Sequence, residues 1–174
     1  VLDAEPGAYL YCGLSRASSK EEIEERIKNN TITEILNKIE VKKGDVVMVK
    51  AGTIHAIGAG IFICEIQQNS NCTYRMYDYD RRDKFGNPRE LHIAKSLDVV
   101  NPVKYEKDNK CNVMLTHNEH YMSKRLVQCK YFEVIKYEIE DEAKIPVDEA
   151  SFLSVIVIDG EGTIMTDDND KELK

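Results

Sequence analysis

The chain has 174 residues, enough for one medium-sized domain or for one domain and part of another. It carries 24 Lys and Arg residues against 31 Asp and Glu residues, which gives a formal net charge of −7. This acidic balance argues against nucleic acid or an anionic membrane as the main partner. No apolar run is long enough to span a membrane, and no signal peptide is visible. Five cysteines without a CxxC pair favour reduced thiols in a cytoplasmic protein.

Both ends of the chain are unusual for a complete protein. The sequence begins at Val1 rather than Met, with VLDAEPGAYLYCGL, and it stops in the charged run DDNDKELK. We therefore expect the chain to be an internal piece of a longer polypeptide.

The first elements predicted in chain order are a strand and a helix. Residues 8–13 are aromatic and apolar, end at a glycine and are typical of a strand. A helix is expected to begin after Ser18 or Ser19, because either serine can cap it and acidic residues follow in the first turn. Ile23 and Ile27 share one face of this helix.

Residues 31–39 predict a second helix. Apolar side chains recur there at helical spacing, at Ile32, Ile35, Leu36 and Ile39. The two helices together form a predicted insertion at about residues 19–39, which we expect to pack on a sheet as a small structural cap.

From Lys42 onward the pattern changes to β structure. Strand-like runs occupy residues 46–49, 61–66 and 73–80. Along the last of these, alternation would place Arg75, Tyr77 and Tyr79 on one face and Tyr74, Met76, Asp78 and Asp80 on the other. A turn at residues 86–88 and a short helix within residues 90–101 complete this region.

The remainder of the chain predicts a second β region. A polar connector follows Lys104, residues 117–125 read as a polar loop, and residues 126–140 alternate over a long run. Residues 151–166 predict two strands around a turn at 159–162. We therefore expect a mainly β chain of sandwich or jelly-roll type, with a boundary near residue 105.

Three residue types suited to chemistry on an anionic small molecule fall within this β structure. His55 lies at a strand end and is a possible zinc ligand, although a lone histidine is more often a structural hydrogen-bonding residue. Glu65 lies in an apolar strand, where partial burial would raise its pKa and suit it to proton transfer. Arg75 could bind a phosphate or stabilise an oxyanion. The structural alternative is a Glu65–Arg75 salt bridge.

Several other candidates have a plainer interpretation. Arg81, Arg82 and Arg89 lie near acidic residues and are expected to form a solvated loop network. His117 and His120, with Glu119, form a rival metal site, but a surface loop is favoured because no helix aligns the rings. His92 is expected to be packed or capping, and Cys64 to be a small apolar filler.

The residues also resemble a known family. The motifs AGTIHAIG, EIQQNSNCTYRMYDYDR and GNPRELHI, within residues 42–101, resemble the core of a type I mannose-6-phosphate isomerase of the short bacterial kind. The resemblance covers about a third of the chain densely and continues more loosely through VLDAEPGAYLYCGL and VIVIDGEGTI. It implies a cupin fold in which residues 1–105 are the C-terminal part of a catalytic cupin domain. Residues 106–174 would then be a connector and an incomplete second cupin-like domain.

The resemblance also implies an activity. Members interconvert mannose 6-phosphate and fructose 6-phosphate through an enediol or enediolate, with the help of Zn²⁺. His55 matches the zinc histidine of the AGTxHA motif, Glu65 matches an active-site glutamate and Arg75 matches an arginine required for turnover. Glu65 is only one candidate for the base.

The chain departs from the family pattern in ways that limit this expectation. The family's other zinc ligands, a Gln, a His and a Glu, lie upstream of a segment like VLDAEPGA and are not in this sequence. Lys50 replaces the usual Pro before the AGT motif. We therefore expect the 174-residue chain alone to be inactive. The alternatives are a non-catalytic cupin that binds a sugar or sugar phosphate and, less favoured, a purely structural β domain.

Overall fold

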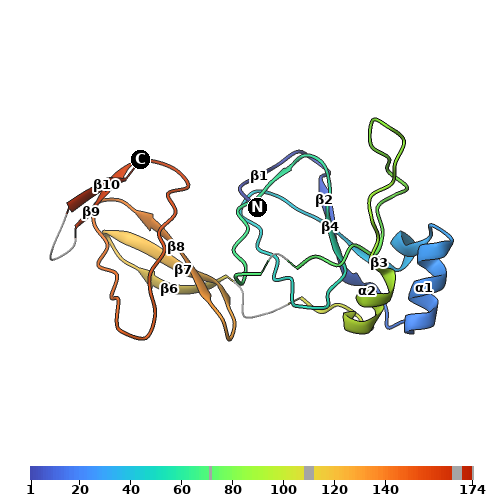
Figure 1. Ribbon diagram of the computed structural model, residues 1–174. Coiled ribbons are helices and arrows are strands. Elements are labelled where there is room, and N and C mark those ends of the chain that lie inside the picture. The colour runs from blue at the N-terminus through green and yellow to red at the C-terminus, as the bar shows by residue number, and fades with distance from the viewer. Residues whose placement is uncertain (71, 108–111, 166–169, 174) are drawn as a thin grey trace.

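The computed structural model describes residues 1–70, 72–107, 112–165 and 170–173 (Figure 1). Over these residues the chain is mainly β, as predicted: ten strands stand against two α-helices. Every pairing between these strands is antiparallel. Within the described part of the chain, no helix is both long enough and apolar enough to cross a membrane.

A three-stranded sheet with β2 at its centre organises the first half of the chain. β3 pairs with one edge of β2 and β4 with the other. Leu10 and Cys12 on β2 are buried and form a small core with Val41. A separate short pair joins β1 to β5. The bounds are β1 (Asp3–Ala4), β2 (Tyr9–Leu14), β3 (Leu36–Glu40), β4 (His55–Ile57) and β5 (Ile61–Phe62).

Helix α1 (Lys20–Lys28) forms as predicted. The Ser19 side chain accepts a hydrogen bond from the Glu22 backbone N–H at 3.1 Å, which satisfies one of the free donors at the helix start. Ile23 and Ile27 are buried in the larger core. Its other buried members are Leu14, Ile32, Ile35, Leu36, Met76 and Val100. Helix α2 (Ile93–Val99), also predicted, lies beside α1 at the same end of the sheet (Figure 1).

The predicted helix at residues 31–39 is wrong. Ile32–Ile35 form a single 3-10 turn (η1), and β3 begins at Leu36, whose φ of −82° and ψ of 147° are extended. The apolar positions are buried as the pattern suggested, but β3 pairs with β2 from Leu14↔Leu36 to Tyr9↔Glu40. Hydrogen bonding to a neighbouring strand has overridden the local helical spacing.

The strands predicted after Lys42 are shorter than expected or absent. Residues 46–49 adopt no regular structure, and within residues 61–66 only Ile61–Phe62 is a strand. Cys64 is exposed, so the prediction that it fills the core is wrong. Its position lies beyond the end of β5, where no ladder orders the alternation of faces.

Residues 73–80 are also not part of a sheet. Alternation survives over part of the run, since Met76 and Asp78 are buried while Arg75 and Tyr77 are half-buried. Tyr79 and Asp80 have positive φ values of 57° and 50°, which end the extended stretch. Tyr74 and Asp80 are exposed, although alternation placed them on the same face as the buried Met76 and Asp78.

A second three-stranded sheet follows, with β7 at its centre. The predicted loop at residues 117–125 is right only for the turn at 118–120, because β7 begins at Tyr121. The long alternating run folds back at residues 129–132 to form the β7–β8 hairpin. The strands are β6 (Val113–His117), β7 (Tyr121–Gln128) and β8 (Glu133–Ile139).

The last strand pair differs from its prediction. β9 (Gly162–Met165) pairs with β10 (Asp170–Leu173), and residues 151–158 form no strand. The predicted turn is present as a bend at Asp159 and Gly160, where Gly160 has a φ of 78°. The apolar side chains of residues 151–158 are exposed, with Phe152 at 86%.

Replacing Ile23 tests the role of the helix in the larger core. Ile23 is fully buried, so Ile23→Ala should lower the free energy of unfolding by about 2–5 kcal/mol, through lost apolar burial and the cavity left behind. Urea denaturation followed by circular dichroism measures this difference. The matched control is Glu24→Ala, which removes only a surface ion pair with Lys28 and should cost less than about 1 kcal/mol. Equal losses would contradict the packing of α1 described above.

Candidate functional site

His55 lies at the start of β4 with one ring nitrogen available to a ligand. Its antiparallel partner on β2 is Cys12, so the two side chains project from the same face of the sheet. Cys12 is fully buried, whereas His55 is exposed. The His55 Nδ1 lies 3.0 Å from the Thr53 carbonyl oxygen. A carbonyl can only accept, so Nδ1 carries the proton and the lone pair of Nε2 can bind a metal.

Glu65 is exposed, so the prediction of partial burial is wrong. It follows the end of β5 and lies in a segment without regular structure. Among the described residues, Glu65 makes no hydrogen bond or ion pair. The predicted structural salt bridge between Glu65 and Arg75 is therefore not formed in the described part of the chain.

Arg75 is half-buried and contacts the segment that precedes α2. Its guanidinium Nη1 donates to the Glu90 carbonyl oxygen at 3.2 Å. Its backbone N–H donates to the His92 Nδ1 at 3.2 Å, and its carbonyl oxygen accepts from the His92 backbone N–H at 2.6 Å. These contacts leave the charge of Arg75 without a carboxylate partner in the described residues, so a cross-strand salt bridge is not its role there.

His55 alone does not make a zinc site. The described residues contain no group of three or more His, Cys, Asp or Glu side chains placed to hold a metal ion. Catalytic zinc usually has three protein ligands. His55 fits the part of one ligand, and the rest of a zinc site is not found in the described part of this chain.

The rival histidine pair forms a surface ion-pair cluster. His120 Nδ1 lies 3.0 Å from both carboxylate oxygens of Asp141, and His120 Nε2 lies 3.5 Å from Glu119. The hydrogen bond from His120 lowers the pKa of Asp141. His117 is exposed at the end of β6. His120 lies on a polar turn, which agrees with the predicted surface loop, whereas His117 is the last residue of β6.

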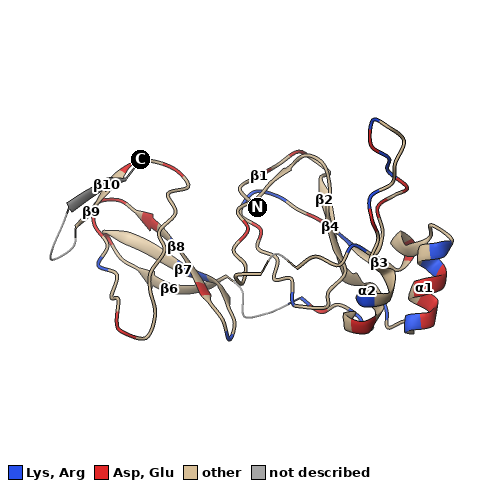
Figure 2. Ribbon diagram, in the orientation of Figure 1, with Lys and Arg blue, Asp and Glu red and all other residues tan. Residues whose placement is uncertain are grey.

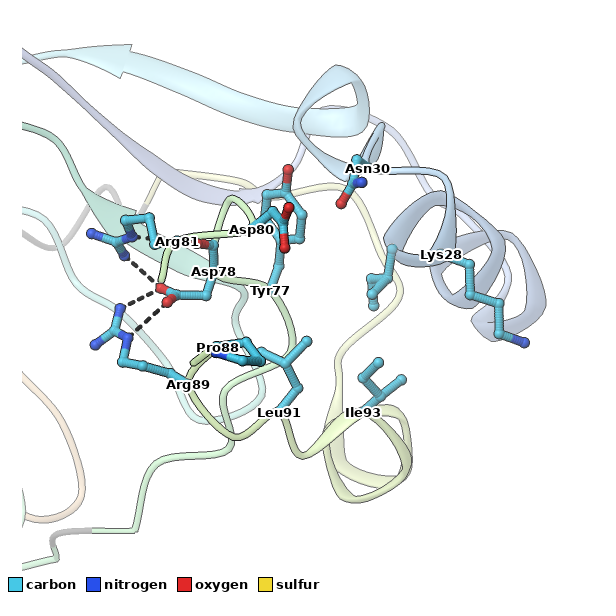
Figure 3. Close-up of a pocket in the computed structure, with 11 residues that line it drawn as sticks. Lys28, Asn30, Tyr77, Asp78, Asp80, Arg81, Pro88, Arg89, Leu91 and Ile93 are labelled. Atoms are coloured by element: carbon cyan, nitrogen blue, oxygen red, sulfur yellow. Dashed lines mark hydrogen bonds and ion pairs between the residues drawn. The ribbon is translucent and has the colours of Figure 1, made fainter. Parts of the chain in front are cut away.

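Asp78 is the centre of the arginine network, and it is buried, with 5% of its surface exposed. Its carboxylate accepts hydrogen bonds from Arg89 Nε at 2.7 Å, from Arg89 Nη2 and from Arg81 Nη2 at 2.6 Å (Figure 3). The Arg89 hydrogen bond is the main cause that lowers the pKa of Asp78 to about 2, with Arg81 contributing further. The prediction of a wholly solvated network is therefore wrong for Asp78.

The remainder of that network lies in an exposed loop. Arg82 pairs with Asp80 at 3.0 Å, and both side chains are exposed as predicted. The loop carries Lys or Arg and Asp or Glu side chains along its length (Figure 2). Mixed charge of this kind favours internal pairing over the binding of one charged ligand.

A cavity of about 230 Å³ lies between the C-terminal end of α1 and the segment that carries Asp78. Apolar side chains including Ile27, Leu91 and Ile93 line it together with Tyr77 (Figure 3). The cavity is not lined by His55, Glu65 or Arg75, so it is distinct from the predicted site.

The sequence patterns did not reveal two contacts between residues that lie far apart in the chain. Burial of Asp78 depends on Arg89, which lies 11 residues further along the chain. His92 occupies the N-cap position of α2 without a side-chain capping bond, and its ring accepts from Arg75 instead. The position of His92 at the helix start agrees with the prediction of a packed or capping residue. The hydrogen bond from Arg75 was not predicted. Nothing in the local spacing relates residues so far apart.

Comparison with known proteins shows similarity to mannose-6-phosphate isomerases. Residues 122–174 match the family described as "Mannose-6-phosphate isomerase, cupin domain". The chain is 37% identical over 166 residues to mannose-6-phosphate isomerase ManA of Bacillus subtilis, covering 95% of this chain and 51% of that protein. It is 40% identical over 164 residues to the mannose-6-phosphate isomerase of Streptococcus mutans, covering 94% of this chain and 50% of that protein.

The fold agrees over the whole chain. The crystal structure of the mannose 6-phosphate isomerase from Bacillus subtilis superimposes with a TM-score of 0.84 at 34% identity, and the match covers all of this chain and 54% of that one. The chain is similar in sequence and in fold to part of these mannose-6-phosphate isomerases. Its mainly β architecture is therefore cupin β structure, as the sequence predicted. The chain spans about half the length of the curated isomerases that it matches.

The buried Asp78 carboxylate predicts that the fold is sensitive to acid. Asp78 has its pKa lowered from 3.8 to about 2 in the folded chain, so its ionised form stabilises the fold at neutral pH. That contribution is present above the unfolded value and should be lost as pH falls through the folded value. Urea unfolding between about pH 5 and pH 2 should therefore show stability falling with pH more steeply for the wild type than for Asp78→Asn.

The control for this measurement is Asp80→Asn, which removes an exposed carboxylate from the same loop. Its stability should follow the wild-type pH dependence. If Asp78→Asn and the wild type lose stability in parallel over this window, Asp78 does not carry the buried, paired charge described above.

Proposed function

We propose that the complete protein containing this chain is an aldose–ketose isomerase that interconverts mannose 6-phosphate and fructose 6-phosphate. The observation that carries the proposal is the similarity to the Bacillus subtilis isomerase, with a TM-score of 0.84 over all of this chain. That match spans the segments that hold His55, Glu65 and Arg75. A cytoplasmic setting and a small sugar-phosphate substrate accompany this proposal.

His55 is proposed as one ligand of a catalytic Zn²⁺. The Thr53 carbonyl fixes the proton on Nδ1, and such an outer contact both orients a ligating imidazole and makes it more basic. The other ligands are proposed to lie upstream of this chain in the complete protein, because the described residues contain no further metal-binding group.

The face around His55 supports the idea that another part of the protein packs there. Ile57, two residues after His55 on the same strand, is 49% exposed, although its cross-strand partner Leu10 is buried. Phe62, in the separate β1–β5 pair, is 65% exposed. We propose that the upstream part covers this face and that residues 1–105 are the C-terminal part of the catalytic cupin domain. Residues 106–174 would be a connector and an incomplete second cupin-like domain.

Arg75 and Glu65 are proposed to act on the sugar directly. Isomerisation moves a proton between neighbouring carbons and develops negative charge on an enediolate oxygen. The guanidinium of Arg75, without a carboxylate partner in the described residues, would stabilise that charge. The exposed carboxylate of Glu65 is a candidate for the base that moves the proton.

A non-catalytic cupin that binds a sugar or sugar phosphate is the second candidate. The observation in its favour is that a three-ligand metal group is missing from the described residues. The two candidates differ in the metal, since only the isomerase requires a complete zinc site. Isomerase turnover by the zinc-loaded complete protein therefore distinguishes them.

Replacing the proposed site residues in the complete protein tests the isomerase. Arg75→Ala should lower kcat by about 10²–10³-fold, the effect of removing a donor that stabilises developing charge, and leave bound zinc unchanged. His55→Ala should lower both zinc content and turnover. Turnover is followed by conversion of mannose 6-phosphate to fructose 6-phosphate, and zinc by elemental analysis.

Arg82→Ala is the control for charge removal, because Arg82 forms only an exposed pair with Asp80. It should keep wild-type kcat. Wild-type protein that is folded and zinc-loaded but does not isomerise mannose 6-phosphate would reject the enzyme and favour the sugar-binding cupin.

The 174-residue chain by itself is expected to be inactive. One imidazole cannot hold catalytic zinc, so added Zn²⁺ should produce no turnover and no tight binding. Isothermal titration with Zn²⁺ and a turnover assay on the same sample check this expectation. Chelator-sensitive isomerisation by the chain alone would overturn the view that further ligands are needed.

A further inference from the structure

Arg75 is held at its backbone by a single residue from a distant part of the chain. Its N–H donates to the His92 Nδ1 at 3.2 Å, and its carbonyl oxygen accepts from the His92 N–H at 2.6 Å. Since residues 73–80 are not in a sheet, no neighbouring strand supplies these bonds. His92 therefore satisfies both backbone polar groups of Arg75, as a paired strand residue otherwise would.

The side chain of Arg75 is held from the same segment. Its Nη1 donates to the Glu90 carbonyl oxygen at 3.2 Å, two residues before His92. Backbone and guanidinium are thus both anchored to residues 90–92. Because the guanidinium is planar and rigid, a hydrogen bond at Nη1 also fixes the directions of its other N–H donors.

The anchoring segment is itself fixed by α2. The Ser96 backbone N–H donates to the His92 carbonyl oxygen at 2.8 Å, and the Ser96 hydroxyl donates to the Tyr74 carbonyl oxygen at 3.3 Å. Ser96 is buried, with 4% of its surface exposed. The Tyr74 ring lies 6.2 Å from the His92 ring, centre to centre. Ser96, in the first turn of α2, therefore hydrogen-bonds both to Tyr74, which precedes Arg75, and to His92, which accepts from the Arg75 N–H.

The contact requires one protonation state of His92. Nδ1 can accept from the Arg75 N–H only if the ring is neutral with its proton on Nε2. The Glu90 carboxylate lies 3.8 Å from the His92 Nε2, and its negative charge favours a proton on that nitrogen. Among the described residues, the Glu90 carboxylate is the charged group in contact with this ring, and the Tyr74 ring lies beside it at a tilt.

We propose that His92 is a positioning residue for Arg75, which uses its neutral imidazole as a hydrogen-bond acceptor to hold the arginine at the reacting sugar. The proposal rests on the isomerase function and the role of Arg75 proposed above. His92 touches Arg75 and acts through it rather than on the substrate.

The test compares three substitutions in the complete protein. His92→Leu removes the acceptor and should lower kcat by about 10–100-fold with KM little changed, because a small displacement of a group that acts in the transition state lowers the rate. His92→Asn keeps an acceptor near the place of Nδ1 and should stay within a few-fold of wild type. His92→Gln, whose acceptor lies further out, should resemble His92→Leu.

Two further measurements separate positioning from general stability. In an Arg75→Ala background, His92→Leu should cause no additional loss of kcat, because the residue that it positions is already absent. An independent loss in that background, or a wild-type kcat for His92→Leu, would overturn the proposal. Thermal melts of each variant show whether the kinetic effects arise from unfolding.

A readout that does not depend on turnover keeps this proposal distinct from the proposed function. Nitrogen-15 shifts of the His92 ring in the complete protein should show Nδ1 unprotonated, and the Arg75 amide should be protected from hydrogen exchange in the wild type and less so in His92→Leu. If the wild type does not isomerise mannose 6-phosphate but these signals are found, only the catalytic use of the contact fails. A proton on Nδ1 overturns the positioning role whatever the activity.

Discussion

The Asp78 carboxylate is buried, and the shape of the surrounding chain depends on keeping it ionised. A buried charge is costly unless it is paired and hydrogen-bonded, and here Arg81 and Arg89 supply the partners from opposite sides of an exposed loop. The Asp83 carboxylate shapes the tip by accepting from the Phe85 and Asn87 backbone N–H groups. Because Arg89 must reach Asp78, the chain returns so that residues 90–92 run beside Arg75.

This arrangement links a structural ion pair to the candidate catalytic arginine. Arg75 has no ladder partner of its own, and its position comes from Glu90 and His92, which follow Arg89 directly. Helix α2 then fixes the same segment through the buried Ser96. Arg75 lies in irregular structure, yet its backbone N–H and carbonyl oxygen are both hydrogen-bonded, and a catalytic group needs such fixed geometry.

This chain supports the fold more fully than it supports the proposed site. The similarity to known isomerases covers 94–95% of the chain in sequence and all of it in backbone structure. Function depends on a site, and a zinc site depends on several ligands meeting at one point. In the described residues the His55 Nδ1 lies against the Thr53 carbonyl oxygen, and no group of three or more His, Cys, Asp or Glu side chains is placed to hold a metal ion.

The fold class and the elements with strong local signals could be predicted from the sequence. The cap at Ser19, the face of α1 at Ile23 and Ile27, and the short helix before Pro102 were all recovered, because each depends on residues a few positions apart. The segment at 31–39 was not, since its apolar positions fit a helix as well as a turn followed by a strand. Pairing with β2 decided between them.

The candidate site divides in the same way. The sequence by itself determined the resemblance to mannose-6-phosphate isomerases and drew attention to His55, Glu65 and Arg75, since short motifs carry those identities in order along the chain. Tertiary structure alone decided that Glu65 is exposed, that Asp78 is buried, and that His92 accepts from Arg75. Burial and long-range hydrogen bonds depend on which segments meet in space, and local spacing does not encode contacts between residues that lie 11 or 17 positions apart.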